Sequence, residues 1–171
     1  MYMAMAATIG FVWRIKVAHA MAAAAAPIGA ALTFLALVTG SIWGKPMRGT
    51  WWAWDVRVTT ELVLLIMYIG YMALRSAMED VARADRASAV LAIVGSVNVP
   101  VVKYSVVWWN SLHQGPTVLN FGKPAMDRSM LWPFYVAMLG IVLYIGGVVC
   151  VRLRAEILRR ERHANWLLEA V

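Results

Sequence analysis

The sequence predicts an all-α integral membrane protein, a helical bundle of about five spans with a short first span. Of its 171 residues, 62% are hydrophobic and 15% are charged, whereas soluble domains are about 45–50% apolar and about 25% charged. The apolar residues also gather in long continuous runs. This composition excludes a disordered chain and a soluble enzyme, and the single cysteine, Cys150, excludes a disulfide scaffold.

Five apolar segments carry this prediction: residues 1–13, 18–43, 58–74, 87–107 and 131–151. The last four are long enough to cross ~30 Å of hydrocarbon at ~1.5 Å per residue. The first would reach only about 20 Å, so we expect either an interfacial stub or, preferably, a span without its beginning. Pro27 and Pro100 are expected to kink the helices that contain them.

Lysine and arginine residues assign the two sides of the membrane. Ten of the sixteen fall at one end of the predicted spans, and five fall at the other. Because cytoplasmic loops are enriched in these residues, we expect a multi-pass membrane protein whose end with ten basic residues is cytoplasmic. The loops 44–57 and 108–130 would lie on the outer side. Residues 1–151 would form the transmembrane domain and residues 152–171 a cytoplasmic basic amphipathic tail.

The net charge of +7 then indicates a lipid bilayer as partner and no nucleic acid.

Tryptophan is concentrated in the first of these outer loops. Trp51, Trp52 and Trp54 lie within four residues. An aromatic belt at the membrane surface explains single rings but explains such a cluster poorly. A flat aromatic platform for a planar ligand or an extended partner segment is the alternative interpretation.

Two charged residues follow the cluster at the start of the third span. Asp55 is a candidate helix N-cap. Arg57 lies in the first turn, where a cation opposes the helix dipole. It could neutralise a ligand carboxylate, or it could pair with Glu61 one turn later. The two interpretations are compatible.

A third group of candidate residues ends the fourth span. Trp108 and Trp109 precede His113, and the pair Gly115-Pro116 is expected to break the helix there. An exposed histidine is usually an ordinary surface residue. A neutral imidazole beside an apolar wall is also a good ligand for haem iron.

The motif in residues 50–57, together with that in residues 108–115, resembles the heme exporter protein C family. This family handles haem in the membrane during bacterial cytochrome c maturation. The likeness extends from Tyr2 to about Arg159. It implies a protein of the bacterial inner membrane with six membrane helices and with the tryptophan-rich loop and His113 in the periplasm. Non-covalent haem b would lie there on the tryptophan platform, held by two axial histidines. Trp51, Trp52, Trp54 and Asp55 match the platform motif, and His113 matches the second axial histidine, a ligand of the haem iron.

The resemblance also implies partners. Haem would pass to the periplasmic haem chaperone, cytochrome c maturation protein E, in the presence of a small membrane subunit, protein D. An ATP-binding cassette pair, proteins A and B, would release the loaded chaperone. The family pattern places a further helix and the first axial histidine upstream of Met1. We therefore expect either a truncated start, with this sixth helix missing, or a second axial ligand from a partner.

The expected function is haem binding at the periplasmic face and delivery to the chaperone for c-type cytochrome biogenesis, without enzymatic chemistry. Tryptophan faces, including Trp108 and Trp109, would contact the macrocycle. Arg57, with Arg48 or Lys45, would neutralise the propionates. The alternative is a membrane scaffold whose tryptophan-rich loop docks a protein partner and binds no cofactor.

Overall fold

The computed structural model describes residues 1–109 and 127–160, without the side chains of residues 106–108, and every regular element in these ranges is an α-helix. The helices are α1 (Tyr2–Trp13), α2 (Lys16–Arg48), α3 (Val56–Ala77), α4 (Val81–Ser96), α5 (Asn98–Trp108) and α6 (Arg128–Arg160). The predicted helical membrane bundle is therefore confirmed. Four spans in the described part of the chain are long and apolar enough to cross a membrane, with α4 and α5 forming one, while α1 is the short apolar helix.

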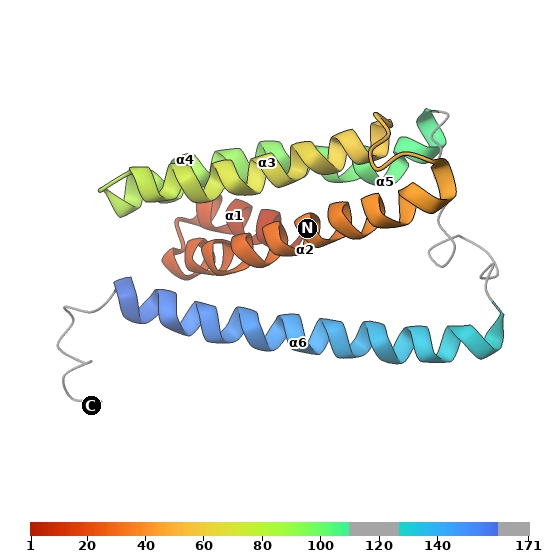
Figure 1. The fold of residues 1–171 in the computed structure, drawn as a ribbon. Coiled ribbons are helices and arrows are strands. Elements are labelled where there is room, and N and C mark those ends of the chain that lie inside the picture. The colour runs from red at the N-terminus through yellow and green to blue at the C-terminus, as the bar shows by residue number, and fades with distance from the viewer. Residues whose placement is uncertain (110–126, 161–171) are drawn as a thin grey trace.

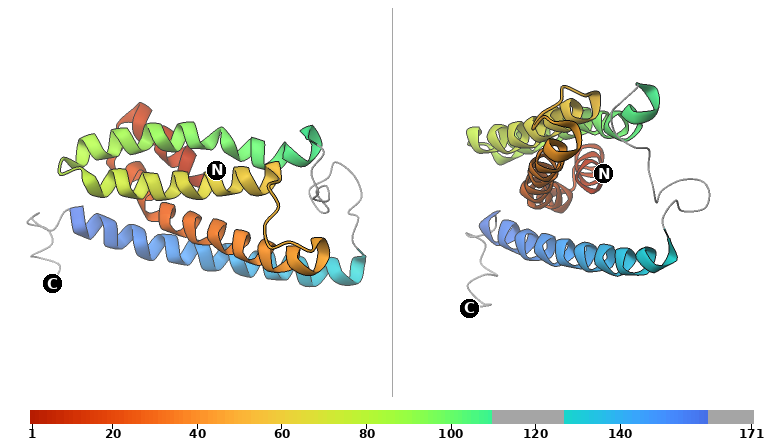
Figure 2. Two further views of the ribbon diagram at one scale, coloured as in Figure 1. Left: turned by 45° about the horizontal axis from the view of Figure 1, so that its top comes forward. Right: turned by 45° about the vertical axis from the view of Figure 1, so that its right-hand side comes forward.

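The helices run roughly along one common direction, and the connections gather at two ends (Figure 1). One end carries the α1–α2 and α3–α4 connections and the C-terminal end of α6. The other end carries the α2–α3 loop, the end of α5 and the start of α6. Helix α6 lies along the outside of the bundle and packs mainly on α2 (Figure 2).

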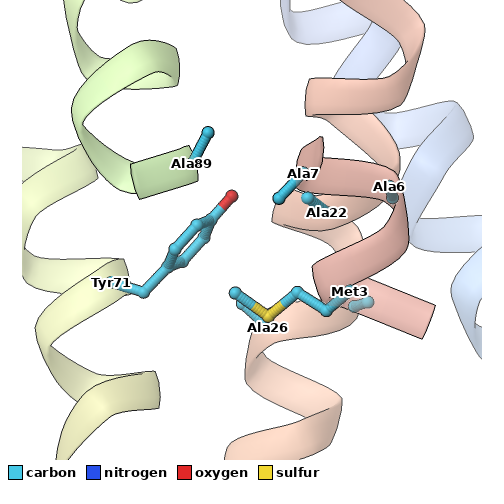
Figure 3. Close-up of a cluster of buried hydrophobic side chains, with 8 residues drawn as sticks. Met3, Ala6, Ala7, Ala22, Ala26, Tyr71 and Ala89 are labelled. Carbon is cyan, nitrogen blue, oxygen red and sulfur yellow. The ribbon is translucent and has the colours of Figure 1, made fainter. Parts of the chain in front are cut away.

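Small residues bring the first four helices together. The core consists of Met3, Ala6, Ala7, Ala22, Ala25, Ala26, Tyr71 and Ala89. Alanine side chains allow close approach of helices that lack a hydrophobic driving force against lipid. The ring of Tyr71 reaches from α3 toward α1 and α2 and fills the space that the alanines leave (Figure 3).

The predicted span 87–107 differs from the structure in one respect. It is divided into α4 and α5 at Val97, three residues before Pro100. Proline has no N–H to donate and clashes with the carbonyl of the preceding turn, so the helix breaks where a kink was expected. The Nδ2 atom of Asn98 donates to the carbonyl of Thr60 at 2.7 Å and ties this break to α3.

Helix α2 is longer than the apolar segment that predicts it. It passes Pro27 and continues for five residues beyond the apolar segment to Arg48, where Gly49 ends it with a left-handed φ of 78°. The N–H of Gly49 donates to the carbonyl of Lys45. Glycine adopts this conformation without steric cost. This termination directs residues 50–55 back across the end of α2 toward the start of α3.

Candidate functional site

A hollow of about 460 Å³ lies between the C-terminal half of α2, the α2–α3 loop and the first turns of α3. Its size is that of a small-molecule site. Three rings (Trp43, Trp51 and Trp52) and three charged side chains (Arg48, Arg57 and Glu61) line it, and Thr39, Gly40 and Ser41 of α2 are part of its wall. We call it the tryptophan hollow.

The cations of this region lie against aromatic rings. The Nζ atom of Lys45 is 5.8 Å from the centre of the Trp51 ring, and the Cζ atom of Arg48 is 5.8 Å from the centre of the Trp43 ring. Both distances are in the range of cation–π attraction. Arg48 folds back along its own helix toward Gly44, whose missing side chain leaves the space for it, since a Cβ atom there would lie 3.2 Å from Nη2. The fold-back keeps the guanidinium in the hollow and away from the surrounding lipid.

Two buried donors of the hollow lack a partner among the described residues. They are the Nη1 atom of Arg48 and the indole Nε1 atom of Trp52, both shielded from solvent. A buried donor without an acceptor costs roughly 1–3 kcal/mol, so native proteins rarely leave two in one site. A carboxylate is the kind of acceptor that satisfies such donors. This pair of donors is the strongest indication of a ligand in the described part of the chain.

The structure separates the predicted site residues into two groups. Trp51, Trp52 and Arg57 line the hollow together, whereas Trp54 and Asp55 do not. The Trp54 ring is 80% exposed and packs edge-on against Trp52, with 5.8 Å between ring centres and 73° between planes. The tryptophan motif of residues 51–54 therefore contributes part of the wall of the hollow and also an exposed aromatic surface outside it.

Asp55 occupies the N-cap position of α3, as expected, but its side chain makes no capping hydrogen bond. The expectation of a carboxylate cap is therefore wrong. Its backbone has the extended conformation of an N-cap, and its carbonyl accepts from the N–H of Thr59 at 2.9 Å. The side chain takes part in another interaction.

The third predicted group is described only in part. Trp108 and Trp109 end α5 at the same end of the bundle as the hollow (Figure 1). The Trp109 ring is half-exposed. His113 lies outside the described residues. Sequence reasoning missed the α2 wall of the hollow, because Thr39, Gly40 and Ser41 carry no signal of their own in an apolar helix.

This fold and this hollow define a multi-pass α-helical membrane protein with an aromatic, cation-lined site at one end. A sequence model of the family described as CcmC, Heme exporter protein C, matches residues 1–168. The chain belongs to that family.

Curated relatives match nearly the whole chain. Heme exporter protein C of Escherichia coli strain K12 is 48% identical over 170 residues, which are 99% of this chain and 68% of that protein. The protein of the same name from Bradyrhizobium diazoefficiens is 48% identical over 159 residues, 93% of this chain and 60% of that protein. The one from Haemophilus influenzae is 44% identical over 165 residues, 96% of this chain and 67% of that protein. The chain thus spans about two thirds of the length of these relatives.

Proposed function

We propose that this protein binds haem non-covalently in the tryptophan hollow and delivers it at the periplasmic face for c-type cytochrome biogenesis. The relatives named heme exporter protein C support haem as the cargo. The role is binding and transfer, and it requires no bond-making chemistry on the ligand.

The observation that carries this proposal is the chemistry of the hollow. Haem is a flat aromatic macrocycle with two carboxylates at one edge. The hollow offers indole faces for the macrocycle and two arginines for the carboxylates. The donors of Arg48 and Trp52 that lack a partner among the described residues are of the kind that pairs with a carboxylate, which supports a propionate as the group bound here. An uncharged planar ligand would leave these donors unsatisfied.

Iron would be held by His113. Trp108 and Trp109 end α5 at the end of the bundle that holds the hollow, and His113 follows four residues later in the sequence. An imidazole is a strong axial ligand of haem iron. A single axial bond from this chain also suits a carrier, because the cargo must be released.

The partner of the transfer would approach the exposed part of the motif. Trp54 is 80% exposed and lies outside the hollow, so it is available to the periplasmic haem chaperone, cytochrome c maturation protein E. We propose the small membrane subunit, protein D, and the ATP-binding cassette pair, proteins A and B, as the other components.

The test is haem retention by the purified chain. The 171-residue protein and its variants are prepared in detergent from haem-replete cells, and absorption and haem per chain are measured. His113→Ala should lose the Soret band while inserting into the membrane normally. Arg48→Gln combined with Trp52→Phe should weaken haem binding by about a hundredfold or more, since each of the two lost charge-assisted hydrogen bonds contributes about 1.5–3 kcal/mol. Retention of full occupancy by His113→Ala would exclude that ligand.

The exposure of Trp51 and Trp54, 60% and 80%, also favours a second candidate function, a scaffold that docks a protein partner without cofactor. It predicts that Trp51→Ala and Trp54→Ala abolish complex formation even in haem-depleted cells. Under the haem proposal, complex formation in those cells is already lost in the unmodified protein. Co-purification with the chaperone, with and without haem synthesis, separates the two.

A further inference from the structure

A second hollow, of about 610 Å³, lies at the opposite end of the bundle from the tryptophan hollow. The end of α1, the first turn of α2 and the start of α4 form it. Three cationic side chains from these three segments, Arg14, Lys16 and Arg86, line it, and all three are exposed. The buried residues Gly10 and His19 are also part of its lining. We call it the basic hollow.

The three cations of the basic hollow form no ion pair among the described residues. Asp85, the carboxylate that lines the same hollow, is engaged elsewhere. One of its oxygens accepts from Arg75 and from Arg160 at 3.1 Å, and the other accepts from Arg160 at 2.9 Å. The Nε atom of Arg86 donates to a carbonyl of its own helix, that of Ala82, at 3.3 Å. Three positive charges therefore share one hollow without a protein anion to balance them.

The backbone at Arg14 supports a role for its side chain. Arg14 ends α1 with a φ of 55°, the one positive φ at a residue other than glycine in the described part of the chain. A left-handed conformation costs an ordinary residue roughly 1–2 kcal/mol, and glycine avoids that cost. The fold alone would favour glycine here, whereas the sequence places a guanidinium at the mouth of the hollow.

The rim of the basic hollow is apolar. Phe11 and Val12 of α1 line it, with 43% and 60% of each residue exposed. In a membrane-spanning bundle, exposed apolar side chains next to basic residues lie at the boundary between acyl chains and headgroups. A free phosphate would use the cations and leave the apolar rim without a contact. A phospholipid would use both.

We propose that the basic hollow is a binding site for one anionic phospholipid. The phosphate lies among Arg14, Lys16 and Arg86, and the acyl chains run along Phe11 and Val12. Each basic residue near an anionic membrane surface contributes about 1 kcal/mol to the binding free energy. Three basic residues around one hollow should therefore bind an anionic lipid more tightly than a zwitterionic one. The site lies at the membrane end with the larger number of lysines and arginines, which is the end that faces the anionic cytoplasmic leaflet in the predicted orientation.

Native mass spectrometry of the purified 171-residue chain tests the proposal. The protein is kept in a neutral detergent and titrated with dioleoylphosphatidylglycerol or with dioleoylphosphatidylcholine. We expect tighter binding of phosphatidylglycerol. Arg14→Gly should bind it about fivefold more weakly, the equivalent of one surface cation, with an unchanged or raised melting temperature because backbone strain is relieved. The triple variant Arg14→Gly/Lys16→Gln/Arg86→Gln should lose the preference.

The matched control is Arg83→Gln. Arg83 lies on α4 one turn before Arg86, is not part of the basic hollow and pairs with Asp80 at 3.3 Å. It should leave lipid binding unchanged. Equal binding of the two lipids, or an equal loss in the Arg83 control, would overturn the proposal. Displacement of phosphatidylglycerol by millimolar sodium phosphate would also overturn it, because the hollow would then be a phosphate site.

Discussion

At the scale of single residues, Gly29 sets how closely α2 and α3 approach. A Cβ atom at this position would lie 2.5 Å from the Cζ atom of Tyr68 and 2.6 Å from Cε1. The position of a Cβ atom is fixed by the backbone, so the Tyr68 ring would have to shift to admit it. Gly29→Ala should therefore destabilise the bundle by about 1–3 kcal/mol, the usual cost of overpacking.

The control for this change is Gly140→Ala on α6, where a Cβ atom would meet nothing within 4 Å. That variant should unfold at the same temperature or slightly higher, because alanine favours helix more than glycine does. Thermal unfolding in detergent, followed by circular dichroism, compares the two. Pairing Gly29→Ala with Tyr68→Leu should restore part of the loss, since the obstructing ring is removed. Equal melting temperatures for both glycine variants would contradict the close approach.

Asp127 makes the start of α6 sensitive to pH. Its carboxylate accepts from the N–H of Ser129 at 2.9 Å and from the Ser129 hydroxyl at 2.7 Å. These bonds favour the ionised form and hold the pKa of Asp127 below its ordinary value. Their contribution is complete above the ordinary aspartate pKa and disappears as the pH falls through the lowered one. The protection factors of the amides of residues 129–131, which compare each rate with the intrinsic rate at the same pH, should therefore fall only in acid. Asp127→Ala should show low protection factors at every pH.

Single residues also show how far the sequence predicts the site. The tryptophan motif and Arg57 are recognisable because aromatic clusters and a cation in a first helical turn are unusual in themselves. Whether a ring lines the hollow or faces outward depends on the loop conformation, which Gly49 begins and which no periodic pattern encodes. Trp52 and Trp54 are two residues apart, yet only Trp52 lines the hollow.

At the scale of elements, ion pairs among four charged side chains connect α6 to α3 and α4. Arg75 of α3 pairs with Asp85 of α4 and, at 2.9 Å, with Glu156 of α6, while Arg160 of α6 pairs with Asp85 at 2.9 Å and Glu156 at 3.0 Å. Each of the four side chains is 14% exposed or less. The two positive and two negative charges of these buried side chains balance, while the exposed Arg159 adds a further bond to Glu156 at 3.0 Å. Removing one of the four buried charges therefore leaves its partner uncompensated.

Asp85→Asn should therefore lower the free energy of unfolding by about 3–5 kcal/mol, the range found when one partner of a buried ion pair is removed. The end of α6 should loosen first, because Arg160 then has one neutral amide oxygen on α4 in place of two carboxylate oxygens. A spin label pair on α6 and α4 would show a broader distance distribution near Arg160. The matched variant is Asp80→Asn, which breaks only the exposed pair with Arg83 and keeps a side chain suited to an N-cap. Asp80→Asn should lower the free energy of unfolding by less than about 1 kcal/mol.

The extent of α6 was only partly predictable. The sequence predicts a span over 131–151 and places the following arginines in a separate tail. In the structure, α6 runs without a break from Arg128 to Arg160. Hydropathy detects where the apolar stretch ends, but it does not detect that Glu156 and Arg160 find partners on α3 and α4. Those partners lie 75 and 81 residues away in the sequence, beyond the reach of any local pattern.

At the scale of the whole molecule, the bundle has two chemically different ends. The end with the tryptophan hollow is rich in indole rings, and the other end carries the ion cluster and the basic hollow (Figure 1). The sequence predicts this polarity because hydropathy places the spans, and the loops between spans then alternate between the two ends. It does not predict which helices pack together. Helix α1 packs against both α2 and α4, which only the three-dimensional arrangement of alanines decides.

The orientation of these two ends in the membrane is the last prediction. The bias of lysine and arginine places the tryptophan loop in the periplasm and the α3–α4 connection in the cytoplasm. Because Cys150 is the single cysteine, Cys150→Ala gives a background for introducing one cysteine at a time. Thr50→Cys in the exposed α2–α3 loop and Met78→Cys in the exposed α3–α4 connection probe the two ends.

A membrane-impermeant maleimide added to intact cells should label Thr50→Cys and spare Met78→Cys, and disruption of the cells should make both reactive. The opposite pattern would invert the molecule. It would place the tryptophan hollow at the cytoplasmic face, where delivery to a periplasmic chaperone is impossible, and the basic hollow at the outer leaflet. The orientation therefore bears on both binding sites at once, whereas haem retention and lipid binding by the purified chain test each site independently of it.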